Sequence, residues 1–376
     1  MNAAPARPIV VTGASTGIGK ASALMLLTLL ATVLTAGPAA AETLLVVRKT
    51  DDAVDFVDPG SGTRLASVAL GHAPHEVSVS PDGRRAAVTN YGTRERPGST
   101  LSIVDLEHGT ELRRIDLAPH TRPHGVAWFA PDRIAVTAEG TKHLLVVDPD
   151  AGRVVSAIET GQEVSHMVAV SSDGTRAFVT NIGSGTTTAL DLATGRKLGD
   201  VVTGAGSEAL ALTPDGRELW VAARADGQLA VVDTASLEVQ ARLPLAGIPI
   251  RIAVTPDGKT ALVTCAGASE LVAFDVAARS VRARRKVDVP LAAGAGQRPF
   301  AQIAPGSALP VGLLLSGDGR SAYVAATMGD VVMQYDTATL EPLRSIAVGG
   351  EPDGLAATVV MPRAPCHACT SGDARH

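Results

Sequence analysis

From Thr43 onward, short apolar runs alternate with polar turns in a long, regular repeat. An apolar run closed by aspartate recurs seven times, at Asp58, Asp105, Asp148, Asp191, Asp233, Asp275 and Asp336. Their separations of 47, 43, 43, 42, 42 and 61 residues match the repeat of about 40–50 residues that is typical of propeller blades. A second marker, a turn of the type Ser-Pro-Asp-Gly, occurs six times in the same phase. Each repeat therefore predicts four short antiparallel strands joined by Gly- and Asp-containing turns.

The two ends of the repeat region complete one another. The first aspartate block has no Ser-Pro-Asp-Gly turn ahead of it, whereas residues 351–360, EPDGLAATVV, resemble the stretch that precedes the other turns. We therefore expect an all-β, seven-bladed β-propeller over residues 42–361, with four antiparallel strands per blade. The C-terminal strand should pair with the N-terminal blade and close the ring.

Residues 1–41 form a segment of a different kind. An apolar run at 24–36 follows Arg7 and Lys20 and is followed by small residues up to Ala41, a pattern typical of a secretory signal peptide. The stretch TGASTGIG at 12–19 resembles the dinucleotide-binding turn of dehydrogenases, but it lacks the surrounding βαβ unit, so we expect no domain and no NAD there. The pattern predicts a periplasmic or secreted protein without a membrane span after signal cleavage.

Composition narrows the classes of partner. The formal charge of −5 and only ten aromatic residues (5 Phe, 3 Tyr and 2 Trp) provide neither a basic face nor a stacking platform, so nucleic acid is not an expected partner. Three cysteines are too few to build a disulfide scaffold in a chain of 376 residues. We expect a monomer with a small molecule or a protein as its partner.

The second strands carry a recognisable motif. AVTN at 87–90 and FVTN at 178–181, each with a Ser-Pro-Asp-Gly-type turn about five residues before it, are similar to the YVTN family of β-propeller repeats. The resemblance covers roughly residues 43–360. It implies a seven-bladed, exported bacterial protein related in shape to lactonase-type and nitrous oxide reductase-type propellers. It does not imply one reaction, because propellers host many unrelated activities.

The start of each innermost strand is the most informative position. Seven residues before the aspartate of the turn, or at the aligned place, stand Asp353, His75, His124, His166, Glu208, Ile250 and Val311, in blade order. Innermost strands line the central channel of a propeller, so these residues should form a ring around one mouth. Three imidazoles with two carboxylates suit zinc, copper or iron. We therefore take His75, His124, His166, Glu208 and Asp353 as candidate metal ligands; the alternative is a set of solvated channel residues.

Two further segments bear on function. The long connection at 291–309 should lie over the same mouth, either as a binding loop or as a plain surface loop. The tail at 362–376, which we expect to be flexible, contains Cys366 and Cys369, but Thr370 stands where the c-type haem motif needs His, so no haem is expected. Three classes stay open: a metal-binding propeller, a non-catalytic scaffold, or a lactonase-like hydrolase. Catalytic residues remain unknown.

Overall fold

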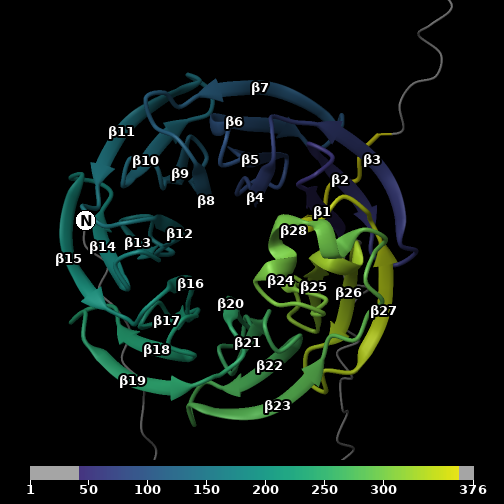
Figure 1. The fold of residues 1–376 in the computed structure, drawn as a ribbon. Coiled ribbons are helices and arrows are strands. Elements are labelled where there is room, and N and C mark those ends of the chain that lie inside the picture. The colour runs from purple at the N-terminus through teal and green to yellow at the C-terminus, as the bar shows by residue number, and fades with distance from the viewer. Residues whose placement is uncertain (1–41, 364–376) are drawn as a thin grey trace, which may run out of the picture. The chain divides into compact units, whose positions relative to one another are not determined.

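The computed structural model describes residues 42–363, apart from the side chains of 299 and 300. Within these residues, 28 strands form seven four-stranded antiparallel sheets arranged around a central channel (Figure 1). Three short 3-10 helices, η1 (Ala295–Gln297), η2 (Pro299–Gln302) and η3 (Thr327–Gly329), are the only helical elements in the described part of the chain. The expected seven-bladed, all-β propeller is confirmed.

The strands of a blade follow one another outward from the channel. The innermost strands are β28 (Pro352–Thr358), β4 (Pro74–Val79), β8 (Pro123–Ala130), β12 (Ser165–Val170), β16 (Ser207–Leu212), β20 (Pro249–Val254) and β24 (Pro310–Leu315). The second strands are β1 (Thr43–Arg48), β5 (Arg85–Gly92), β9 (Arg133–Ala138), β13 (Arg176–Asn181), β17 (Glu218–Ala223), β21 (Thr260–Cys265) and β25 (Ser321–Ala326). The third strands are β2 (Ala53–Asp58), β6 (Pro97–Asp105), β10 (His143–Asp148), β14 (Thr186–Asp191), β18 (Gln228–Asp233), β22 (Glu270–Asp275) and β26 (Val331–Asp336). The outermost strands are β3 (Thr63–Ala69), β7 (Thr110–Asp116), β11 (Arg153–Glu159), β15 (Arg196–Val202), β19 (Val239–Pro244), β23 (Ser280–Lys286) and β27 (Pro342–Ala347).

Burial explains the apolar pattern of the middle strands. In β17 and β21, for example, both faces pack against neighbouring blades, so nearly every residue is buried and the sequences ELWVAA and TALVTC are almost continuously apolar. The outermost strands face solvent on one side, and β11 alternates exposed residues with partly buried ones. The core is therefore a set of clusters between adjacent blades rather than one central mass.

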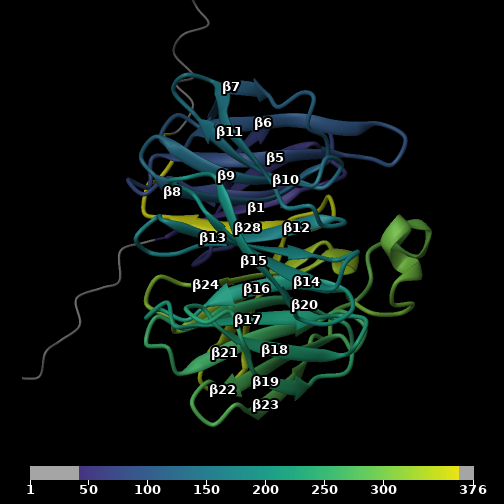
Figure 2. The same ribbon diagram turned by 90° about the vertical axis from the view of Figure 1, so that its left-hand side faces the viewer.

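The ring closes with a β ladder between the two ends of the repeat region. Strand β28 pairs antiparallel with β1, with Thr43 opposite Thr358 and Leu45 opposite Ala356. The first blade thus takes its innermost strand from the C-terminal end and its other three strands from the N-terminal end, as expected (Figure 2).

The repeated aspartates and glycines are structural. Asp233 ends β18, and its carboxylate accepts hydrogen bonds from the amides of Ala235 and Ser236 at 3.0 and 2.7 Å, which caps the following turn. Gly216 has φ of 70°, and a Cβ at this position would meet no atom within 4 Å, so its backbone angle rather than crowding requires glycine. Neither set takes part in the site.

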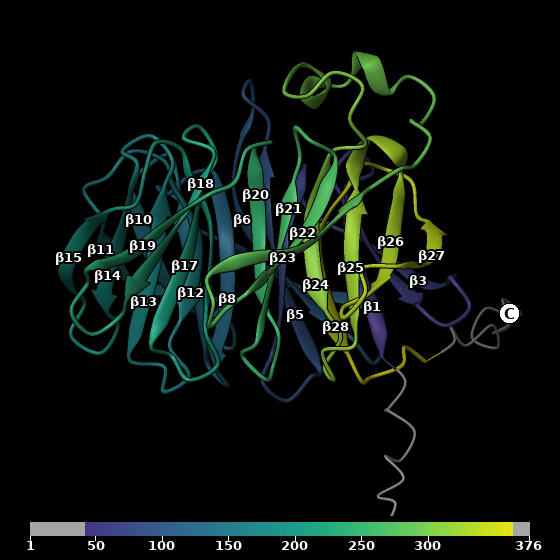
Figure 3. The same cartoon turned by 90° about the horizontal axis from the view of Figure 1, so that it is seen from below.

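Two loops project from the same side of the ring (Figure 3): the β5–β6 hairpin and the connection between β23 and β24. The latter, residues 287–309, carries η1 and η2 and is called the cap loop below. None of the helices in the described residues is long and apolar enough to cross a membrane. The predictions of a signal peptide at 1–41 and of a Cys366/Cys369 tail fall on residues outside the described part, except that 362 and 363 are described.

Candidate functional site

The predicted ring residues all occupy the second position of an innermost strand. In blade order they are Asp353, His75, His124, His166, Glu208, Ile250 and Val311. All seven line one cavity of about 350 Å³ at the end of the channel where these strands begin, which we call the mouth cavity. The structure therefore brings the five candidate ligands and two apolar residues into one space.

A threonine of the preceding blade holds three of the polar ring positions. The hydroxyl of Thr89 donates to the carbonyl of His124 at 2.9 Å, that of Thr137 to His166 at 2.5 Å, and that of Thr180 to Glu208 at 2.8 Å. These threonines belong to the Val-Thr motif of the second strands, where they are buried. The motif thus fixes the backbone of the next blade at the channel, which places successive ring side chains side by side.

A second ring of cavity residues escaped the sequence analysis. Six residues at the ends of second strands also line the cavity: Tyr91 lies near the end of β5, and the others directly follow their strands, namely Lys49, Glu139, Ile182, Arg224 and Thr327. Counting two residues past the threonine of the Val-Thr motif would have found Tyr91, Glu139 and Ile182, and the aligned places in the other blades are Lys49, Arg224 and Thr327. This second ring supplies the cavity with its lysine, one arginine and a further carboxylate.

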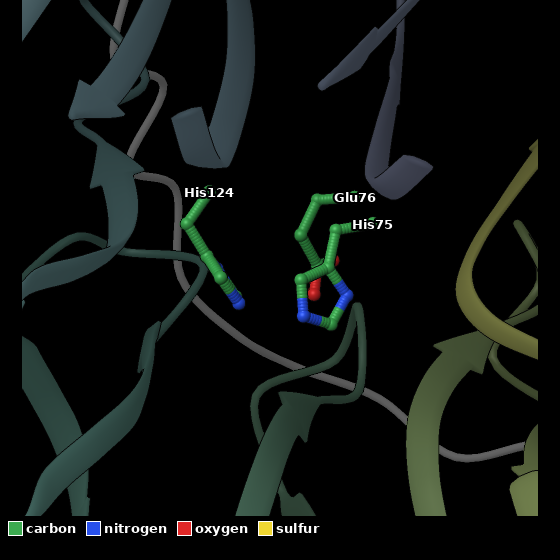
Figure 4. Close-up of side chains that lie close together, drawn as sticks. All are labelled: His75, Glu76 and His124. Carbon is green, nitrogen blue, oxygen red and sulfur yellow. The ribbon is translucent and has the colours of Figure 1, made fainter. Parts of the chain in front are cut away.

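Three histidine rings pack against one another at the mouth. The centroids of His75 and His124 are 4.3 Å apart, and those of His124 and His166 are 3.7 Å apart. Figure 4 shows the His75 and His124 rings pointing into the same space from β4 and β8. His124 is only 2% exposed, and no group of the described residues hydrogen-bonds its Nδ1. A buried polar nitrogen without a partner costs free energy, so this atom is poised to receive a ligand.

Carboxylates hold the two outer histidines. Nδ1 of His75 lies 2.5 Å from the Asp353 carboxylate, which is also 3.1 Å from the Lys49 ammonium. His166 lies between two acids, with Nδ1 2.5 Å from Glu139 and Nε2 3.1 Å from Glu208. The sequence-predicted acids therefore contact histidines rather than standing free in the channel.

His124 and His166 have opposite protonation states because of their surroundings. Burial, together with the neighbouring imidazoles His166 and His75, lowers the pKa of His124 well below its usual value, so His124 is neutral. Burial alone would also lower the pKa of His166, but the carboxylates of Glu208 and Glu139 more than offset it and raise that pKa to about 9. At neutral pH, a neutral imidazole therefore stacks against a charged one.

Two groups of side chains have the composition of a metal site. The ligand atoms of His75, Glu76 and His124 lie within 4.8 Å of one another, and so do those of His124, Glu139 and His166. Sequence reasoning missed both glutamates. Glu76 follows His75 directly, and strict strand alternation would turn it away; the register of β4 against β5 shifts between Pro74 and Val77, so alternation fails there.

An ion pair spans the channel beside the first group. Arg251 of β20 donates to the carboxylate of Glu76 of β4, although these residues lie 175 positions apart in the chain. Both side chains are buried, and the pair fixes the orientation of the Glu76 carboxylate. No repeat pattern pointed to it, because it depends on the width of the closed ring.

The other histidines of this face lie outside the cavity lining. His120 and His143 have ring centroids 4.9 Å apart, and His72 pairs with Asp52 at 3.3 Å. The cysteine outside the tail, Cys265, is buried in β21, and burial raises the pKa of its thiol to about 12. This cysteine therefore acts as a core residue.

Comparison with known proteins supports the fold. Residues 130–272 match the family model described as "Cytochrome D1 heme domain", a β-propeller family. No curated protein matches the chain. The assignment to YVTN repeats stays a prediction.

Similar solved structures include three propellers of low sequence identity. Hydrazine synthase of Kuenenia stuttgartiensis shares 22% identity with a TM-score of 0.65, over 80% of this chain and 93% of that one. The periplasmic gluconolactonase of Pseudomonas aeruginosa shares 20% with a TM-score of 0.67, over 84% and 99%. A functionally unknown protein of Desulfotomaculum acetoxidans shares 13% with a TM-score of 0.69, over 85% and 99%. At these identities the likeness concerns the fold.

The family match corrects one expectation. The sequence analysis expected no haem because Thr370 stands where an attachment motif needs histidine, and a match to a haem domain overturns that expectation. The physical reason is that the motif reports only covalent attachment, whereas a haem held through an axial imidazole and noncovalent contacts leaves no such spacing.

Proposed function

We propose that this chain is an exported propeller that binds a metal centre at its channel mouth, with His124 as the central ligand. The buried Nδ1 of His124, which has no hydrogen-bond partner, carries the proposal. A metal bound there would give this nitrogen the partner it lacks, and burying it without one costs free energy. The low pKa of His124 keeps its lone pair available, since only neutral imidazole binds a metal.

His75, Glu76 and His124 are the ligand set that we favour. Two imidazoles and one carboxylate form a known catalytic set for zinc and for non-haem iron, with positions left open for water or substrate. Asp353 holds Nδ1 of His75, which leaves Nε2 as the ligand atom, and Arg251 orients the Glu76 carboxylate. This arrangement resembles the outer shell that ordinarily supports a histidine ligand.

In the second group, His124, Glu139 and His166, the contacts of His166 favour a role other than metal binding. A cation held between two carboxylates is a poor ligand until it loses its proton, so His166 and Glu139 serve better as a proton-holding pair next to the centre. Glu208 stabilises that charge and is itself paired with Arg224 at 2.8 Å. The sequence-predicted ligands thus divide into direct ligands, His75 and His124, and supporting groups.

Metal analysis of the purified mature chain, before and after chelation, tests the proposal. We expect one zinc, copper or iron ion per chain, removed by chelator and restored on titration. His124→Ala should abolish binding, whereas Asp353→Asn should weaken it roughly 10- to 100-fold. His108→Ala is the matched control, because His108 is exposed and pairs with Asp105 in a turn. If the wild-type chain binds no ion, or the His124 variant binds normally, the proposal is wrong.

A haem is a second candidate, favoured by the family match at residues 130–272. Two features of the cavity fit such a group in kind, an imidazole nitrogen and an apolar wall. Its arginines, Arg224 and Arg251, are already paired with Glu208 and Glu76, so the haem carboxylates would have to displace those acids. A bound haem would supply redox and ligand-binding chemistry at its iron. Hemin titration followed by absorbance spectroscopy separates the two candidates, since a bare ion gives no Soret band.

The periplasmic location is part of the same proposal. It is supported by the signal-like segment at 1–41 and by the fold shared with a periplasmic protein. N-terminal sequencing of exported material should find a start near Glu42; cytoplasmic material that retains residues 12–19 would contradict the proposal.

A further inference from the structure

The ring of innermost-strand residues around the mouth cavity is chemically two-sided. Five consecutive blades, from Asp353 to Glu208, contribute the polar ring residues, and the two remaining blades contribute Ile250 and Val311. Ile303 and Leu309 of the cap loop line the same cavity. An apolar wall therefore shares one small space with the histidine cluster.

The cap loop is held in place beside this wall. Arg298 forms two hydrogen bonds with the Asp330 carboxylate, at 2.8 and 2.7 Å, which ties the loop to the turn before β26. Leu309 packs in a buried cluster with Ile250 and Met328, next to the cavity. The loop thus acts as an ordered part of the wall, and its Ala295 and Ala304 are buried in the same cluster.

The cations that line the cavity are already paired. Lys49 contacts Asp353, Arg224 contacts Glu208, and Arg251 contacts Glu76. A strongly anionic ligand such as phosphate would have to displace these carboxylates from their partners. A neutral ligand would disturb none of these pairs.

From these observations we propose that the cavity takes a small, neutral organic ligand with an apolar body and a single nitrogen or oxygen donor. The donor faces the histidine centre, and the apolar body lies against Ile303, Leu309 and Val311. The volume of about 350 Å³ lies within the range of small-molecule sites. This inference rests on the proposed metal centre in its single-ion form and adds the class of ligand.

The test compares two probes, imidazole and 4-phenylimidazole, which share the donor and differ by an apolar ring. Calorimetry on the metal-loaded mature chain should show 4-phenylimidazole binding at least about tenfold more tightly, since burying the phenyl surface is favourable. Ile303→Ser should reduce this preference below about threefold. Leu291→Ser is the matched control: it lies in the same loop and is similarly exposed (45% against 43%), but it does not line the cavity.

The outcomes separate this inference from the metal proposal. Metal content is measured on every variant, and Ile303→Ser should keep it unchanged. Equal affinity for the two probes, no binding of either, or an unchanged preference in Ile303→Ser would overturn the inference while leaving the metal result intact. If the wild-type chain instead takes up no metal in the analysis, the metal centre is refuted. If that chain still prefers 4-phenylimidazole and loses the preference in Ile303→Ser, the apolar wall is supported on its own.

Discussion

The threonine of the Val-Thr motif offers the sharpest test of how the site is positioned. Thr137 of β9 is fully buried; its hydroxyl donates to the His166 carbonyl of the next blade and accepts from the Gly125 amide of its own blade at 2.8 Å. The register of β8 against β9 shifts between Pro123 and Val126, so the hydroxyl stands in for a ladder partner there. Thr137→Val keeps the side chain's shape and removes both hydrogen bonds.

The expected loss follows from the two groups left behind. An amide and a carbonyl without partners in a buried region each cost about 1–3 kcal/mol, so Thr137→Val should lower the free energy of unfolding by roughly 2–6 kcal/mol. Thr137→Ser keeps the hydroxyl and loses one methyl group, which should cost only about 1 kcal/mol. We therefore predict that the free energy of unfolding decreases in the order wild type, Thr137→Ser, Thr137→Val.

Chemical denaturation of the three proteins at neutral pH measures this order. Because the valine change also frees the backbone of His166, its ring resonances should shift in an NMR spectrum, whereas those of the serine variant should stay close to wild type. If Thr137→Val unfolds at the wild-type denaturant concentration, or if serine is worse than valine, the methyl packing matters more than the hydroxyl and the positioning argument fails.

Three further predictions concern closure, pH and the channel ion pair. Truncation after Gly350 removes β28 and should give aggregated chain on size exclusion, whereas truncation after Pro362 should elute as wild type; identical behaviour of the two would mean that another strand closes the ring. The pKa of His166, about 9 in the folded chain against about 6.5 unfolded, stabilises the fold fully below pH 6.5, so the free energy of unfolding should fall between pH 6.5 and 9, and His166→Gln should flatten that slope. Arg251→Met leaves Glu76 buried without its partner and should cost about 3–5 kcal/mol in denaturation, much of it recovered when Glu76→Leu is added; a double variant no more stable than the single would refute this.

The repeat alone was enough to predict the architecture. Seven aspartates and six turns fixed the number of blades, and the unmatched EPDG stretch predicted the closing strand, because each blade repeats the same local turn chemistry. Counting back from those turns, together with alignment of the EPDG stretch for Asp353, also reached all seven ring positions. The position of a residue along its strand depends only on its spacing from the nearest turn, and this spacing can be read directly from the sequence.

What each ring residue does was decided by the tertiary structure. His124 and His166 have equivalent positions in sequence, yet His124 is neutral with an unpartnered Nδ1, and His166 is a cation between Glu139 and Glu208. The contacts that set this difference join different blades, and the pair between Arg251 and Glu76 crosses the channel. Distances between blades, and the burial that shifts each pKa, exist only once the ring has closed; a repeat pattern does not contain them.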